Sequence, residues 1–172
     1  LTMPNAGAIG PVAKKASEAG IPTVGLNAGM DEYQKYGMSA FFGQEEKVAG
    51  NKAGERLKSE GAKHTLCVIH EQGNSSQESR CAGVKKGLGN GKVELLYVNG
   101  KDLTAAQSTI NAKLSQDPSI DWVMALQASV AMRSADAVAD ASSKAKVSTF
   151  DTNAELVGAI ADQRIQWAVD QQ

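Results

Sequence analysis

The fold is decided by residues 64–83, HTLCVIHEQGNSSQESRCAG. An apolar run of strand length is followed by a Gly-Asn-Ser loop and then by a helix start, where Ser75 and Glu78 have the spacing of a capping box. Strand, loop and helix in this order form the repeating unit of parallel α/β sheets. Arg80 is unusual here, because the positive end of the helix dipole disfavours a cation in the first turns. We therefore expect an anionic or polar group to meet Arg80.

The same alternation of strand and helix runs along the whole chain. Between the apolar runs, apolar residues recur at three- and four-residue spacing, for example at Leu103, Ile110 and Leu114, as in helices that bury one face. Most runs are continuously apolar, which is typical of strands covered on both sides. The sequence therefore predicts an α/β fold with a doubly wound parallel sheet, a Rossmann-like architecture. The predicted strands are 22–27, 39–44, 64–70, 92–98, 122–127, 146–151 and 165–170.

Composition places the chain among ordinary globular domains and excludes several classes of function. Its 172 residues suffice for one well-buried domain, or for one and part of another, and 42% are hydrophobic and 22% charged. The net charge of −1 gives no electrostatic reason to bind nucleic acid or an anionic membrane. No apolar run reaches the roughly 18–20 residues of a membrane helix. The chain starts in a loop and stops where a strand finishes, so we expect it to be a fragment.

Two cysteines lie fourteen residues apart, Cys67 in a predicted strand and Cys81 in the next helix. No second pair and no CxxC spacing indicates a zinc site, so no metal is expected. The two side chains could be small buried hydrophobic residues, or they could form a disulfide if the compartment is oxidising. The sequence leaves both interpretations open.

Polar side chains stand where the predicted strands end, which is the edge at which open parallel sheets bind ligands. Asn and Gln offer donors and an acceptor, Asp accepts through two oxygens, and Arg offers a planar fork of donors. This inventory predicts a small polyhydroxylated ligand. The strand-end residues are Asn27, Arg80, Gln127, Asp151, Asp170 and Gln171. Several have an ordinary alternative role: a turn for Asn27, an exposed loop for Gln127, a helix cap for Asp151, and a surface pair with Glu71 or Glu78 for Arg80.

Motifs of the common enzyme classes are missing from the sequence. It holds no GxxxxGK[ST] loop, no GxGxxG after a strand and no GxSxG elbow. Because His64 and His70 are the two histidines, a Ser-His-Asp triad is poorly supported. His70, which stands beside Glu71, could act as a general acid, but a structural or loop role for His70 is the stronger interpretation. The sequence therefore favours a non-enzymatic binding protein without a cofactor.

The sequence resembles the ribose/galactose-type (type I) periplasmic sugar-binding proteins of ABC transporters. The matching segments are GIPTVGLNAG (20–29), FFGQEEKVAGNKAGERL (41–57), GNSSQESRCAG (73–83), DPSIDWVMALQ (117–127) and STFDTNAELVGAIADQRIQWAVDQQ (148–172). The resemblance covers nearly the whole chain in consistent order, and it implies a two-lobed protein that closes around a sugar. It further implies that residues 1–43 are a remnant of the N-terminal lobe and residues 44–172 the C-terminal lobe, ending at the hinge.

The resemblance also implies roles for the strand-end residues. Asn27 would contact ligand hydroxyls, and Arg80, as the Arg of an R-x-x-G motif, would reach the ring oxygen of the sugar and neighbouring hydroxyls. Asp151 would be the Asp of the family's FD pair, and Gln171 its hinge glutamine. Gln127 stands where the family usually has Asn, so the identity of the ligand stays open.

The implied partners are a sugar or polyol and the membrane permease of an ABC importer, with no nucleic acid. The implied location is periplasmic or extracytoplasmic, with a signal peptide in the missing N-terminus. Two alternatives remain: the effector core of a lactose-repressor-like transcription regulator, and a Rossmann-like enzyme with unrecognised chemistry. A helix-turn-helix ahead of residue 1 would indicate the regulator, and turnover of a substrate would indicate the enzyme.

Overall fold

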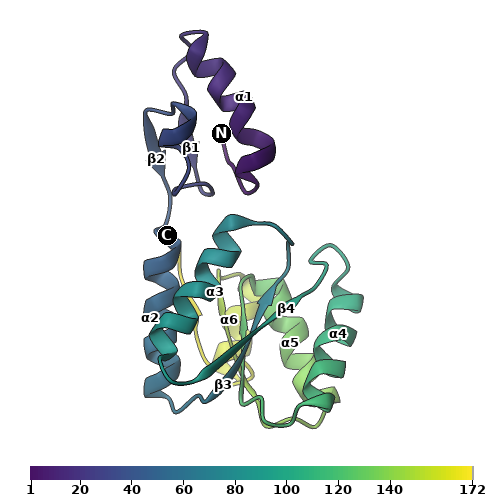
Figure 1. Cartoon of the computed structure of the whole chain (residues 1–172). Coiled ribbons are helices and arrows are strands. Elements are labelled where there is room, and N and C mark those ends of the chain that lie inside the picture. Colours follow the sequence, from purple (N-terminus) through teal and green to yellow (C-terminus); the bar gives the residue numbers. More distant parts are fainter. Residues whose placement is uncertain (172) are drawn as a thin grey trace.

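The computed structural model of the protein describes residues 1–171 and consists of two parallel sheets flanked by helices (Figure 1). All seven predicted strands form, and each is shorter than predicted. Among the described residues, no helix is both long and apolar enough to span a bilayer. The elements are α1 (Ala6–Glu18), β1 (Val24–Leu26), the 3₁₀ turn η1 (Gln34–Tyr36), β2 (Ala40–Phe42), α2 (Glu46–Ser59), β3 (His64–Ile69), α3 (Ser75–Leu88), β4 (Lys92–Tyr97), α4 (Leu103–Gln116), β5 (Trp122–Ala125), α5 (Ala128–Asp140), β6 (Lys146–Phe150), α6 (Ala154–Ala161) and β7 (Ala168–Val169).

The larger sheet has the strand order β4-β3-β5-β6-β7, and all neighbouring pairs are parallel. Successive residues of β3 face opposite sides, so Leu66 and Val68 join one core while Cys67 and Ile69 join the other. Helices α4, α5 and α6 contribute to the first core, and α2 and α3 contribute to the second. Helices on both faces of a parallel sheet confirm the predicted doubly wound α/β class.

The smaller sheet contains β1 and β2, which pair in parallel. The start of the chain runs along β1, because the Leu1 amine donates to the Val24 carbonyl at 3.0 Å and the Leu26 amide donates to the Leu1 carbonyl at 2.9 Å. A single connection leads from β2 to α2, and the segment that follows β7 lies beside it (Figure 1). There Gln171 and Gln44 line one hollow. The two sheets therefore approach each other near Gln44, before α2, and near Gln171, after β7.

Helices α2 and α3 pack backbone against backbone. Each carries two glycines four residues apart: Gly50 and Gly54 in α2, Gly83 and Gly87 in α3. A Cβ added to Gly50 would lie 2.2 Å from the carbonyl oxygen of Arg80, and one added to Gly87 would lie 2.0 Å from that of Asn51. Because these glycines have no side chains, the two helices can approach this closely. The approach brings the first turn of α2 next to Arg80.

Gly87→Ala should lower the free energy of unfolding by about 1–3 kcal/mol, because the new methyl group meets backbone atoms that move only if α2 moves. Gly158→Ala is the matched control. Nothing lies within 4 Å of a Cβ added to Gly158 in α6, so alanine there should be neutral or stabilise by up to about 1 kcal/mol. Urea unfolding of both variants measures the difference. Equal stabilities would contradict the packing argument.

Cys67 of β3 and Cys81 of α3 form a disulfide, with their Cα atoms 6.0 Å apart. The structure thus selects one of the two interpretations that the sequence left open. Both residues belong to the core that α2 and α3 form against the sheet. The bond ties the part of α3 that carries Arg80 to β3.

Candidate ligand-binding site

A hollow of about 320 Å³ lies at the carboxyl ends of the strands and is lined from both sheets. We call it the strand-end hollow. The structure brings together in it the five residues predicted to bind ligand: Asn27, Arg80, Gln127, Asp151 and Gln171. Its other lining residues are Ala28, His70, Glu71, Asn74, Ser76, Gln77 and Leu126. Asp170, the remaining strand-end residue, lines two neighbouring hollows instead.

The strand-end hollow lies where the strand order reverses. In chain order β3 comes first in the larger sheet, β4 pairs on one side of it, and β5 pairs on the other. His70 and Arg80 follow β3, and Gln127 follows β5, so these residues flank the reversal. Open parallel sheets bind ligands in this crevice, because neighbouring loops there lead away in opposite directions.

Arg80 is buried, with 6% of its surface exposed. Its Nε donates to Oε2 of Glu46 at 2.5 Å and its Nη2 donates to Oε1 of Glu46 at 2.9 Å, which makes a bidentate pair. Nη2 also donates to Oε1 of Gln171 at 2.6 Å. The alternative of a surface pair with Glu71 or Glu78 is therefore wrong, because the carboxylate that meets Arg80 comes from α2.

The sequence analysis predicted no role for Glu46, which lies 34 residues before Arg80. Glu46 stands in the first turn of α2, where the helix dipole favours a carboxylate, and it is 7% exposed. Its charge compensates that of Arg80, which would otherwise be buried in the unfavourable first turns of α3. The paired glycines of α2 and α3 are the sequence signal that could have indicated this contact, because they predict close helix packing.

Gln171 joins Arg80 to Asp151: its Oε1 accepts from Arg80, and its Nε2 donates to Oδ1 of Asp151. Asp151 and Asn27 both adopt the left-handed backbone region, with φ of 63° and 64°. Asn and Asp enter this region more readily than other non-glycine residues, and such positions gather at binding sites. Asn27 thus has the turn conformation expected as its alternative role, and it also lines the strand-end hollow. The capping alternative for Asp151 is wrong, because Asn153 caps α6.

Gln127 is partly buried and stands directly before α5, with no side-chain hydrogen bond to the helix start. The exposed-loop alternative for Gln127 is therefore wrong. Its amide borders the strand-end hollow and two adjoining ones. An amide in this place can both donate to and accept from a hydroxyl group.

His70 borders the strand-end hollow and is held by Gln77. Gln77 accepts the backbone N–H groups of His70 and Glu71 through Oε1, so its amide nitrogen faces Nε2 of His70 at 3.1 Å. Burial lowers the pKa of His70, and the positive charge of Arg80 adds to that shift, while Glu71 and Asp151 oppose it. A pKa below the ordinary value leaves the imidazole uncharged at neutral pH.

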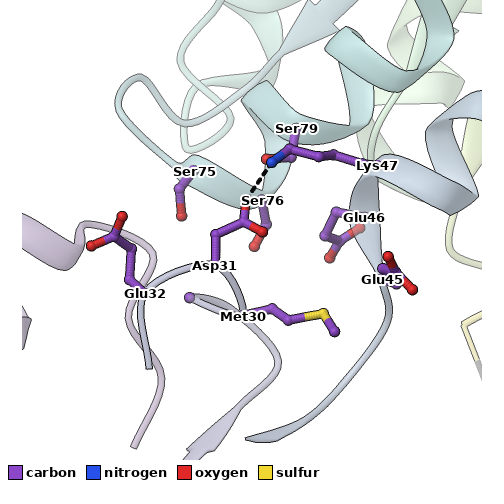
Figure 2. Close-up of a pocket in the computed structure, with 10 residues that line it drawn as sticks. Met30, Asp31, Glu32, Glu45, Glu46, Lys47, Ser75, Ser76 and Ser79 are labelled. Carbon is purple, nitrogen blue, oxygen red and sulfur yellow. Dashed lines mark hydrogen bonds and ion pairs between the residues drawn. The ribbon is translucent and has the colours of Figure 1, made fainter. Parts of the chain in front are cut away.

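A second hollow, of about 170 Å³, is lined by Glu46 but not by Arg80 (Figure 2). We call it the interface hollow, because residues 29–32 from the smaller part face the first turns of α2 and α3 in it. Lys47 Nζ donates to Oδ2 of Asp31 at 2.8 Å across this gap. Both side chains are mostly exposed, so solvent screens the pair and it stabilises the contact little.

His64, Glu94 and Asp117 gather near the start of β3, away from the strand-end hollow, close enough to share a cation. Lys113 Nζ lies 2.5 Å from Oε1 of Glu94, and Lys92 Nζ lies 3.2 Å from Oε2. Hydrogen bonds from Lys113 and Lys92 lower the pKa of Glu94. Because two ammonium groups already balance these carboxylates, the cluster is explained without a metal ion.

Comparisons with known proteins place the chain in a family. Residues 1–172 match the family described as "Periplasmic binding protein domain". A carbohydrate transporter from Acidothermus cellulolyticus 11B, solved in complex with myo-inositol, is 48% identical with a TM-score of 0.96, covering 99% of this chain and 59% of that chain. A periplasmic sugar binding protein from Legionella pneumophila is 22% identical with a TM-score of 0.89, covering 99% and 65%. The glucose-galactose binding protein GanP from Geobacillus stearothermophilus is 18% identical with a TM-score of 0.84, covering 99% and 62%.

The two likenesses below 25% identity show the fold alone. The chain spans 59% of the length of the Acidothermus structure, and 99% of the chain is covered by that match. Among curated proteins no match was found.

Proposed function

We propose that the protein captures a sugar or polyol for an ABC importer, because this chain belongs to the periplasmic binding protein domain family. Membership of the family confirms the resemblance seen in the sequence. The observation that carries the proposal is the strand-end hollow, where side chains from distant parts of the chain meet. Amides of Asn27, Gln127 and Gln171 can donate and accept, which suits hydroxyl groups that do both.

The mode of capture proposed is closure of two lobes around the ligand. Residues 1–43 would belong to one lobe and residues 44–172 to the other, with the hinge at Gln44 and Gln171. Residue 172 lies outside the described residues. Ligand contacts from both lobes would favour the closed state, as in other hinge-bending binding proteins. Asn27 supports this, because it reaches the hollow from the smaller sheet while Arg80 and Asp151 reach it from the larger.

The proposed protein is non-enzymatic, works outside the cytoplasm and delivers its cargo to a membrane permease. The Cys67–Cys81 disulfide supports an oxidising compartment. It argues against the transcription-regulator alternative, since a DNA-binding regulator works in the reducing cytosol. The bound myo-inositol of the Acidothermus relative supports a polyol as the first ligand to test.

Asp151→Asn tests the proposal in the full-length protein. Asparagine tolerates the left-handed backbone of this position, so the change removes a hydroxyl-accepting carboxylate without forcing the chain to move. Calorimetry with myo-inositol, hexoses and pentoses should show binding by the wild type and roughly 10- to 100-fold weaker binding by the variant. Asp162→Asn, at an exposed residue that borders none of the hollows described here, is the control and should bind like the wild type.

Two results would contradict the proposal. The assignment of the site fails if Asp151→Asn binds the same ligand as tightly as the wild type. The proposed function fails if the folded full-length protein binds none of these sugars and polyols.

A further inference from the structure

An arginine in a binding cleft ordinarily indicates an anionic ligand. The guanidinium is permanently charged, and its fork of donors matches the oxygens of a carboxylate or phosphate. Arg80 is the one cationic side chain among the residues that line the strand-end hollow. Its surroundings therefore decide whether the hollow attracts anions such as sugar phosphates and sugar acids, or uncharged polyols.

The fork of Arg80 is already occupied by protein groups. The side-on edge of the guanidinium, formed by Nε and Nη2, donates both of its hydrogen bonds to the carboxylate of Glu46. The second hydrogen of Nη2 goes to Gln171. Nη1 is left with one long contact of 3.5 Å to the carbonyl of Leu126. A ligand thus meets a single nitrogen, which suits one hydroxyl or ring oxygen better than a two-oxygen anion.

Glu46 balances the positive charge of Arg80 in addition to occupying its hydrogen-bond donors. Once Glu46 balances Arg80, the lining keeps two carboxylates, those of Glu71 and Asp151. Both are held by neutral amides: Asn74 donates to Glu71 at 2.7 Å, and Gln171 donates to Asp151. Lys101 borders an adjoining hollow, but it is exposed and solvent screens its charge. The strand-end hollow is therefore negative, and a ligand anion would be repelled by it.

Glu46 produces this effect without facing the ligand. It lines the interface hollow (Figure 2) and is absent from the lining of the strand-end hollow, which Arg80 does line. A ligand in the strand-end hollow would therefore meet Arg80 and not Glu46. We propose, on the basis of the proposed function, that Glu46 sets the ligand class of this site: paired with Arg80, it makes the hollow select uncharged polyols and reject their phosphates and acids. Glu46 is a positioning residue, because it acts through Arg80.

The test compares each neutral ligand with its own anion in the full-length protein. Calorimetry would use myo-inositol with myo-inositol 1-phosphate, and glucose with glucuronate. For whichever neutral ligand binds, the wild type should bind the anion at least about 100-fold more weakly. Glu46→Gln keeps the shape of the side chain and removes its charge. Glu46→Gln should lower the ratio of the affinity for the neutral ligand to the affinity for its anion at least about 10-fold, mainly by strengthening the binding of the anion.

Glu45→Gln is the matched control, because Glu45 precedes Glu46, borders the same interface hollow and is exposed. It should leave the ratio of the two affinities as in the wild type. A measurement on the wild type alone covers the case in which Glu46→Gln fails to fold: rejection of the anion should weaken between low salt and about 0.5 M salt.

The inference is overturned if the wild type binds the anion as tightly as the neutral ligand, if Glu46→Gln keeps the wild-type ratio, or if salt leaves the ratio unchanged. These results differ from failure of the proposed function, in which neither the neutral ligand nor its anion binds.

Discussion

Arg80→Met is expected to lower the free energy of unfolding by about 3–5 kcal/mol, because it leaves the carboxylate of Glu46 buried without its partner. Methionine keeps much of the apolar volume of the arginine stem, so the loss reports the stranded charge more than a cavity. Glu46→Leu should lower the free energy of unfolding by a similar amount, because the guanidinium of Arg80 would then be buried without its partner. Urea unfolding without ligand measures both variants.

The double variant separates stranded charge from lost packing. When Arg80→Met and Glu46→Leu are combined, no charge is left buried, and apolar side chains fill the space between α2 and α3. Such replacements of buried ion pairs are often neutral or stabilising, so the double variant should be far more stable than the sum of the two single losses predicts. Additive losses would contradict this account of the pair.

Lys52→Met provides the control on the same helix. Lys52 pairs with Glu55 at 2.8 Å, but both side chains are largely exposed, so breaking this pair should change stability far less than breaking the buried one. A loss at Lys52 as large as the loss at Arg80 would show that burial of the pair is not what matters.

Replacing both cysteines by alanine is expected to lower the free energy of unfolding by about 3 kcal/mol. The bond closes a loop over a sequence separation of 14 residues, and cutting it restores conformational freedom to the unfolded chain. Unfolding would be followed with and without a thiol reductant. The wild type should lose stability when reduced, and the double variant should not respond to the reductant.

Single-cysteine variants extend this test. Cys67→Ala and Cys81→Ala each break the same bond, so each should lose about as much as the double variant once the remaining thiol is kept reduced. If the wild type and the double variant unfold at the same urea concentration in the absence of reductant, the disulfide contributes no stability and the prediction is wrong.

Local pattern was sufficient for the order of elements, because a buried parallel strand reads as a short continuous apolar run wherever it lies in the chain. The run at 64–70 became β3 for this reason. Details that depend on competition between neighbouring polar residues were less well predicted. Helix α3 is capped by Asn74, which accepts from the amides of Ser76 and Gln77, one residue ahead of the predicted Ser75. Either residue is a good cap, and the turn after β3 decides between them.

The doubly wound sheet, and the shared edge at which Asn27, Gln127 and Asp151 gather, could be predicted from the amino-acid sequence. Parallel strands bring their carboxyl ends to a common side, so the position of a residue at a strand end is enough to place it there. The pairing of Arg80 with Glu46 and the bond between Cys67 and Cys81 became evident only in the folded chain. Both contacts depend on how closely α3 approaches α2 and β3, a distance set by packing across the whole core rather than by any local pattern of residues.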